Sequence, residues 1–180
     1  METETLNTAK GPITLRPAVP EDAAPLRALR LEGLARHPWA FASDDVTAAQ
    51  ESAEDWARRI TQYAAENTGV IYVAAGGDEL LGMVGVFCGN KLKTRHGAWI
   101  YGVYVREAWR GLHIAEALLN GCVAWARAQR LVVVKLGVAT INTPAIRCYA
   151  RCGFAVYGVE PKVILHAGVY YDELLMAREL

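Results

Sequence analysis

Residues 142–154 read NTPAIRCYARCGF, and the fold is most sharply indicated by this stretch. Asn142 or Thr143 can cap a helix, and Pro144 suits its first turn. Gly153 suits the left-handed position at which a helix ends. The stretch therefore predicts a helix over residues 143–151.

One face of this helix carries side chains that end in polar groups. At 100° per residue, the positions within about 80° of one another are Asn142, Ala145, Tyr149 and Cys152. Such a face suits a ligand, but a core tyrosine with a solvated hydroxyl gives the same pattern.

A second stretch, residues 103–115, reads VYVREAWRGLHIA and runs from a strand through a turn into the start of a helix. The backbone N–H groups of a helix's first turn lack intrahelical partners and lie at the positive end of its dipole, so this connection suits a pyrophosphate. Gly111 and Ala115 let the backbone approach a ligand closely. An ordinary strand-to-helix connection gives the same pattern, and the stretch contains neither a Walker loop nor GxGxxG.

Together, and in this order, the two stretches resemble the GNAT acetyltransferase superfamily, in the form of its small bacterial members. Residues 110–115 match the coenzyme A signature Arg/Gln-x-x-Gly-x-Gly/Ala, and residues 142–154 match Asn-x-x-Ala-x-x-x-Tyr-x-x-x-Gly-Phe at every position. Residues 13–17 with the Leu-rich stretch after Asp22 are similar to the family's opening. His113 stands where the family has its central Gly. We expect its side chain to point outward or to donate to phosphate, because backbone donors do not depend on residue type.

The resemblance implies that acetyl-CoA lies between two central parallel strands, residues 98–105 and 132–138. It implies that backbone groups of Val103 and Val105 pair with the pantetheine arm, which Asn142 also contacts. The amine would attack the thioester directly while Tyr149 protonates or hydrogen-bonds the departing thiolate. No metal is expected. The residues implied to bind the cosubstrate are Val103, Tyr104, Val105, Arg110, Gly111, Leu112, His113, Ile114, Ala115, Asn142 and Tyr149.

The group that accepts the amine's proton is not given by a motif. An alkyl amine with a pKa near that of Lys, about 10.4, is protonated at neutral pH. We prefer Glu32 as the second catalytic residue, since the first helix helps to form the acceptor site in the family that the chain resembles. His96, Glu107 and Glu160 are alternatives that also fit solvated side chains, and water could relay the proton. The aromatic residues expected either to line the acceptor site or to pack in the core are Trp39, Phe41 and Tyr101.

Apolar spacing and turn residues predict the other elements. The order predicts an α/β (α+β) protein with the GNAT fold, in which a mixed central sheet of about six to seven strands is flanked by helices on both faces. We expect one acyl-CoA N-acyltransferase domain over residues 1–180, with 1–10 as a flexible tail. The expected strands are 13–16, 70–75, 80–88, 98–105, 132–138, 154–159 and 170–176, and the expected helices are 21–37, 52–65, 114–127 and 143–151, with a loop at 43–45.

Composition excludes several classes of protein. Nineteen basic and nineteen acidic residues give a net charge of zero, which disfavours a nucleic-acid partner. No window approaches the roughly 20 apolar residues of a membrane span, and the acidic N-terminus is unlike a secretory signal. We therefore expect a cytoplasmic protein without a membrane partner. The four cysteines show no CxxC or metal-ligand spacing.

These observations predict an N-acetyltransferase that transfers the acetyl group of acetyl-CoA directly to a primary amine of a small molecule, peptide or protein. The alternative is a non-catalytic acyl-CoA-binding or sensing module of the same fold, which His113 and the unidentified base favour and Tyr149 disfavours. A nucleotide-binding α/β domain is more remote. The apolar last strand is where a homodimer would form.

Overall fold

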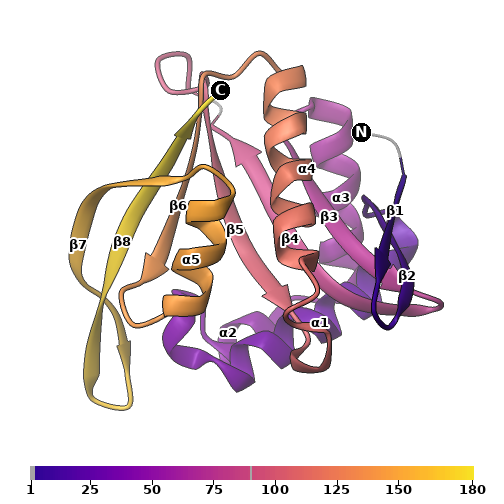
Figure 1. The fold of residues 1–180 in the computed structure, drawn as a ribbon, viewed down its shortest axis with the longest axis horizontal. Helices are drawn as coiled ribbons and strands as arrows, with labels where there is room; N and C mark the ends of the chain where they lie inside the picture. Colours follow the sequence, from indigo (N-terminus) through magenta and orange to yellow (C-terminus); the bar gives the residue numbers. More distant parts are fainter. Residues whose placement is uncertain (1–2, 90) are drawn as a thin grey trace.

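The computed structural model describes residues 3–89 and 91–180. Within these residues eight strands form one sheet in the order β1-β2-β3-β4-β5-β6-β8-β7 (Figure 1). β5 and β6 run parallel, whereas the other neighbouring strands are antiparallel. The strands are β1 (Glu4–Thr8), β2 (Gly11–Pro17), β3 (Gly69–Gly76), β4 (Glu79–Cys88), β5 (Gly97–Val105), β6 (Val133–Ala139), β7 (Ala155–His166) and β8 (Val169–Glu179).

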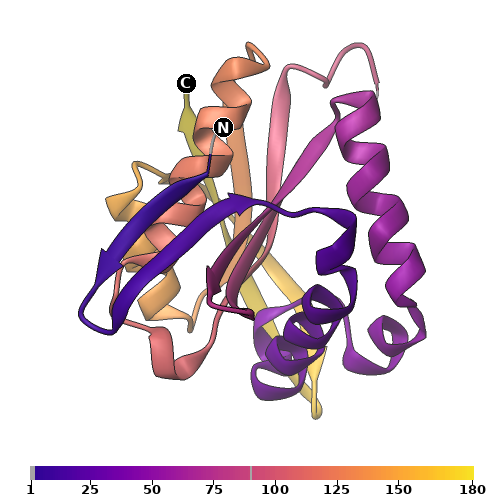
Figure 2. The ribbon, with the colours of Figure 1, turned by 90° about the vertical axis from the view of Figure 1, so that its right-hand side faces the viewer.

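Helices cover both faces of the sheet, as the sequence predicts (Figure 2). One face carries α1 (Ala23–Arg36), α2 (Asp45–Gln50) and α3 (Ala53–Glu66), and the other carries α4 (Ile114–Ala128) and α5 (Thr143–Arg151). Each face has an apolar core. Leu118 and Leu136 belong to the core under α4 and α5, and Leu29 and Trp56 belong to the core under α1 and α3.

Local capping explains why the predicted helices form where they do. Ser52 and Asp55 cap α3 reciprocally, since the Asp55 amide donates to Ser52 Oγ at 3.2 Å and the Ser52 amide donates to Asp55 Oδ2 at 2.8 Å. Asn67, at φ +56°, ends the helix. α5 has the predicted bounds, and α4 extends one residue beyond its predicted end.

The prediction of a flexible tail over residues 1–10 is wrong for the described part of that segment. β1 pairs with β2 from Glu4 opposite Leu15 to Thr8 opposite Gly11, and Leu6 packs against the core. A strand at a sheet edge can be held by backbone hydrogen bonds to one neighbour and a single buried apolar side chain. The polar composition of β1 therefore does not identify it as a strand. This strand also raises the count within residues 3–89 and 91–180 to eight, above the predicted six to seven.

Two further differences arise from local features. α2 occupies part of an expected loop because the Asp44 side chain accepts from the Thr47 amide at 2.7 Å and caps it. β7 is longer than predicted because a register irregularity between Glu160 and Ile164 accommodates Pro161 in an edge strand. No helix in the described ranges is long and apolar enough to cross a membrane.

The feature that positions the site is the divergence of β5 and β6. In the described residues their pairing covers Gly97–Trp99 against Val133–Lys135. Beyond Trp99 the two strands separate, while β6 stays paired with β8 through Ala139. The β4–β5 register shifts between Met83 and Gly85, and Gly102 has φ +63°, as expected for a bulge that bends β5.

Candidate active site

A cavity of about 750 Å³ opens where β5 and β6 diverge. This volume lies within the range of small-molecule sites, roughly 300–1,000 Å³. Its walls are the ends of β5 and β6, the start of α4, one side of α5, and the segment after α1. The residues with a predicted role that line it are Trp39, Phe41, Tyr101, Val103, Tyr104, Val105, Arg110, Gly111, His113, Ile114, Ala115, Asn142 and Tyr149.

The last part of β5 offers a free backbone edge to the cavity. The Arg106 amide donates to the Leu81 carbonyl on β4 at 2.9 Å. Because backbone groups alternate in direction along a strand, those of Val103 and Val105 point the other way, into the space that β6 has left. The Val105 carbonyl accepts from Arg110 Nε at 3.1 Å, so its amide and the groups of Val103 are the ones available to a ligand.

The start of α4 forms one end of the cavity. Gly111 and His113 have φ values of +77° and +60°, and this left-handed geometry turns the chain into the helix. The first-turn amides from Ile114 onward have no acceptor within the helix, which suits them to an anion. The connection predicted from the sequence therefore has the geometry of an anion site.

His113 lies at the rim of the cavity with an exposed side chain. Its Nδ1 is 2.6 Å from Glu116 Oε2. Arg151 Nε donates to the other Glu116 oxygen at 2.6 Å. These contacts, led by that with His113, lower the pKa of Glu116. Glu116 also lines the cavity and was not singled out from the sequence, since its role depends on Arg151 of another helix.

Arg110 and His37 meet at the cavity wall. Arg110 Nη2 is 2.8 Å from His37 Nε2. Burial lowers the pKa of His37, and the positive charge of Arg110 lowers it further, so the ring is neutral at pH 7 and accepts this hydrogen bond. Arg110 thus joins the segment after α1 to the end of β5.

α5 presents both of its predicted residues to the cavity. Asn142 Oδ1 caps the helix by accepting from the Ala145 amide at 3.4 Å. Tyr149 is buried, and its ring packs edge to face on Phe154 with centroids 6.4 Å apart. Burial raises the pKa of Tyr149, so its hydroxyl keeps its proton at neutral pH and can donate it.

Glu32 does not line the cavity. Its two carboxylate oxygens accept from the Tyr104 hydroxyl at 3.0 Å and from Arg106 Nε at 3.1 Å. This pairing fixes α1 against β5 and leaves the carboxylate committed to other groups. The structure therefore does not bring Glu32 together with Tyr149.

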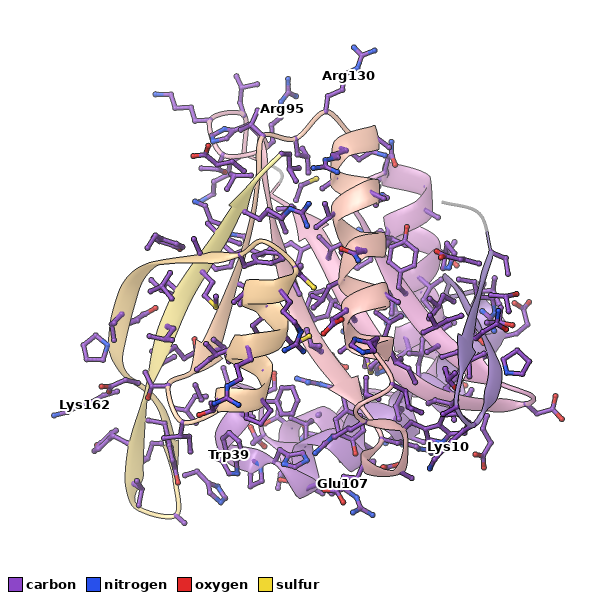
Figure 3. The ribbon with its side chains drawn as sticks, in the orientation of Figure 1. Lys10, Trp39, Arg95, Glu107, Arg130 and Lys162 are labelled. Atoms are coloured by element: carbon purple, nitrogen blue, oxygen red, sulfur yellow. The ribbon has the colours of Figure 1, made fainter. Side chains whose placement is uncertain are left out.

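Other predicted residues are also placed away from the cavity. Leu112 packs against the core under α4. Glu107 pairs with Arg36 at 3.5 Å, and neither His96 nor Glu160 belongs to the cavity wall. Figure 3 shows Trp39 and Glu107 at the end of the molecule toward which β5 and β6 run. Among the described residues, no cluster of three His, Cys, Asp or Glu side chains could hold a metal ion.

Curated relatives share parts of this chain. It is 34% identical over 82 residues to the L-amino acid N-acetyltransferase AaaT of Escherichia coli K12, covering 43% of this chain and 49% of the relative. It is 31% identical over 107 residues to the L-methionine sulfoximine/L-methionine sulfone acetyltransferase of Pseudomonas aeruginosa PAO1, covering 59% of this chain and 61% of the relative. The chain thus matches less than two thirds of the length of either relative.

Solved structures share the fold over nearly the whole chain. A GNAT-family acetyltransferase from Streptococcus pneumoniae superposes with a TM-score of 0.84 at 23% identity, covering 93% of this chain and 99% of that one. The yncA protein of Salmonella typhimurium, solved with its cofactor acetyl-CoA, superposes with a TM-score of 0.82 at 19% identity, covering 93% and 94%. The sequence model of the acetyltransferase (GNAT) family matches residues 31–154, more than half of the chain. The protein belongs to the GNAT acetyltransferase family.

Proposed function

We propose that this protein transfers the acetyl group of acetyl-CoA directly to the primary amine of an acceptor. The observation that carries the proposal is the opening between β5 and β6, where a free strand edge leads from the first turn of α4 to a buried tyrosine. A strand edge suits a chain of amides, a helix start suits a pyrophosphate, and a protonated hydroxyl suits a departing thiolate. Acetyl-CoA carries all three groups along its length.

The cosubstrate would bind mainly through the backbone. The amide of Val105 and the amide and carbonyl of Val103 would pair with the pantetheine arm as a neighbouring strand would. The amides from Gly111 to Ala115 would hold the pyrophosphate, and Asn142 would contact the pantetheine. Tyr104 would contribute only to the cavity wall, because its backbone pairs with Met83 on β4 and its hydroxyl donates to Glu32 at 3.0 Å.

Tyr149 would act as the general acid. The amine nitrogen forms a bond to the acetyl carbon, the carbon–sulfur bond breaks, and the sulfur takes the hydroxyl proton. The nitrogen then gives its extra proton to the tyrosinate, which restores the hydroxyl. The raised pKa of Tyr149 supports this role, because the hydroxyl is protonated when the thiolate leaves. General-acid assistance contributes about 10²–10⁴ in rate.

The names of the curated relatives favour small acceptors. They describe an L-amino acid N-acetyltransferase and an enzyme of L-methionine sulfoximine and L-methionine sulfone. We therefore propose a small amine rather than a peptide or protein N-terminus as the acceptor of this chain.

Calorimetric titration with acetyl-CoA tests the proposal first, with free CoA and ATP as comparisons. We expect micromolar binding at one site per chain, weaker binding of ATP, and thiol release when amines are added. Absence of acetyl-CoA binding would refute the proposal. Binding without turnover on any amine would instead establish the non-catalytic acyl-CoA-binding module.

The remaining parts of the proposal concern the protein's domain organisation, location and oligomeric state. We propose one acyltransferase domain that works in the cytoplasm without nucleic acid. A homodimer is supported by the exposed apolar side chains of the β7–β8 hairpin, among them Val159, Leu165 and Tyr170. Light scattering coupled to gel filtration would detect the dimer, and a monomer at micromolar concentration would refute it.

A further inference from the structure

Two opposite charges lie over the two strands that form the cavity. Gly102 on β5 and Gly137 on β6 both line it. A Cβ atom at Gly102 would lie 3.9 Å from Arg30 Nη1, and one at Gly137 would lie 2.5 Å from Glu173 Oε2. The absence of a side chain at Gly137 makes room for the Glu173 carboxylate, and Gly102 is within ordinary contact distance of Arg30.

Both charges lie on the face of the sheet that α1 covers. The same Gly102 position is 3.8 Å from Met83, which belongs to the core under α1 and α3. Leu136 and Val138, on either side of Gly137, belong to the opposite core, so Gly137 points toward α1. Arg30 and Glu173 are not themselves part of the cavity wall; each lies beside a glycine that is, on the same side of the sheet.

Arg30 has a buried hydrogen-bond donor that lacks an acceptor within the described part of the chain. Its Nη1 is buried, and no described residue accepts a hydrogen bond from it. Its guanidinium stacks on the ring of Phe41, 4.6 Å from the centroid, and Phe41 lines the cavity. Glu51 attracts Arg30, but its carboxylate is bound by Arg59 Nη2 at 2.6 Å. A buried guanidinium ordinarily has a carboxylate of its own.

Glu173 is the complementary anion. Burial raises its pKa, and so does the neighbouring carboxylate of Glu160, while no cation or hydrogen bond of the described residues opposes them. Its charge also contributes to the raised pKa of Tyr149. Glu173 is therefore a half-buried carboxylate that lacks a positive partner among the described residues.

We propose that the acetyl acceptor is a free amino acid, with its carboxylate held by Arg30 and its ammonium group held by Glu173. This inference rests on the proposed function. A guanidinium matches the planar geometry of a carboxylate, and an ammonium group has three protons to donate. An amino acid neutralises both side chains at once. A polyamine would place a cation beside Arg30, and a peptide N-terminus has no adjacent carboxylate.

The protons and electrons balance with these residues. The ammonium group gives one proton to Glu173, and the freed lone pair forms the bond to the acetyl carbon. The sulfur leaves with the carbon–sulfur pair and takes the proton of Tyr149. The nitrogen then gives its extra proton to the tyrosinate, and Glu173 releases its proton to water. The products are the N-acetyl amino acid, CoA with a free thiol, and one proton.

An acceptor panel tests the substrate class. Thiol release would be measured with saturating acetyl-CoA, using the twenty proteinogenic L-amino acids and the methyl ester of each. We expect kcat/KM for the best amino acid to exceed that of its ester at least tenfold, because the ester has lost the charge that Arg30 binds. Esters used as well as acids, or no turnover of any amino acid, would overturn the inference. The proposed function would fall only if acetyl-CoA did not bind or no amine at all were acetylated.

Arg30→Met tests the carboxylate site. We expect it to raise KM for the amino acid about tenfold to a hundredfold, leaving the acetyl-CoA Kd unchanged, since a hydrogen bond to a charged group is lost. We also expect Tm to rise by a few degrees, because the substitution removes an uncompensated buried charge. Arg58→Gln is the matched control and should leave KM unchanged, because Arg58 is exposed and pairs with Asp55 rather than with a neighbour of Arg30. A lower Tm with an unchanged KM would show a structural role and overturn this assignment.

Glu173→Gln tests the ammonium site. We expect kcat to fall at least tenfold with the acetyl-CoA Kd unchanged, because the amide cannot take the proton. Glu160→Gln, which removes the neighbouring exposed carboxylate, should reduce kcat less than threefold. Equal effects of the two substitutions, or no effect of Glu173→Gln, would overturn the assignment of Glu173.

Discussion

Tyr149 combines burial with a polar tip, and the two properties support the same role. The ring is fixed against Phe154 and the core under α4, which places the hydroxyl reproducibly. Burial also raises the hydroxyl's pKa above its ordinary value of about 10. A phenol in this position is a donor at every pH at which the protein is expected to work.

Tyr149→Phe should therefore lower kcat at least tenfold while changing the acetyl-CoA Kd less than threefold. The ring and its packing remain, and only the transferable proton is lost. Steady-state thiol release and calorimetry measure the two quantities. An unchanged kcat would remove Tyr149 from the mechanism. Because the pKa is raised, the wild-type rate should not fall through loss of this proton below about pH 10.

His113 occupies a backbone conformation that favours glycine. At φ +60° and ψ +14° a residue with a Cβ atom is strained by about 1 kcal/mol. The side chain partly compensates through its contact with Glu116, but the imidazole is exposed, and ion pairs with an exposed partner contribute little.

His113→Gly should stabilise the protein by up to about 1 kcal/mol and raise Tm by about 2–4 °C. The acetyl-CoA Kd should change less than threefold, because the amides at the start of α4 are retained. Ala167→Gly, at φ +48° in the β7–β8 turn, is the matched control for relief of strain alone. A Kd weakened tenfold by His113→Gly and not by Ala167→Gly would show that the imidazole donates to the ligand.

At the scale of elements, one ion pair fixes where the first helical segment begins. Arg16 at the end of β2 donates to both oxygens of Asp22, at 2.6 and 2.8 Å, and the Val19 amide adds a third hydrogen bond at 2.8 Å. Burial raises the pKa of Asp22, but the hydrogen bonds from Arg16 and Val19 lower it more, so its net pKa is below the ordinary value. The strand, the turn Pro20–Asp22 and α1 are thus held together by one carboxylate.

Asp22→Asn should lower the free energy of unfolding by about 2 kcal/mol at pH 7, because two charge-assisted hydrogen bonds are weakened. A depressed pKa in the folded state means that the stabilisation is complete above the unfolded pKa, about 3.9, and disappears as pH falls through the folded value. Urea unfolding at pH 7 and in acid should show the difference between wild type and variant shrinking below about pH 4. Asp78→Asn, in an exposed turn, should change stability less than 0.5 kcal/mol. A difference that persists in acid would contradict the ion pair.

The elements that the sequence predicts are those with local signals. Ser52 with Asp55 and Asn142 with Ala145 mark helix starts within four residues, and both helices begin where predicted. β1 lacks such a signal, because its pairing with Leu15 depends on a partner rather than on composition. The contacts of Glu32 could not be predicted from the sequence either, because its partner Arg106 lies far along the chain.

The same distinction separates the two halves of the candidate site. Contiguous motifs predict its cosubstrate side, from Gly111 to Ala115 and from Asn142 to Tyr149, and the cavity walls include both segments. The acceptor side has no contiguous motif. Arg30 of α1 and Glu173 of β8 each lie beside a glycine of the cavity wall, and only the fold places them there.

For the whole molecule, the cavity lies where the strands of the sheet are least paired with one another. In the described residues, three residue pairs join β5 to β6, compared with seven that join β6 to β8. The backbone groups of Val103 and Val105 that lack a strand partner must be solvated in the free protein. A ligand that pairs with this edge while contacting α4 and α5 connects the two parts of the sheet, so binding and folding are coupled.

Acetyl-CoA at a hundred times its Kd should therefore stabilise the folded protein by about 2.7 kcal/mol, which corresponds to a rise in Tm of about 5–10 °C for a chain of this size. Differential scanning fluorimetry over a concentration series measures the rise, and its dependence on concentration should return the calorimetric Kd. Tyr149→Phe should show the same rise, because the substitution removes a proton donor and not a binding contact. ATP at equal concentration should produce less than half of it, since it offers phosphates to α4 but no amide chain to β5. A rise as large with ATP would mean that the start of α4 binds phosphate alone and that the free edge of β5 contributes nothing.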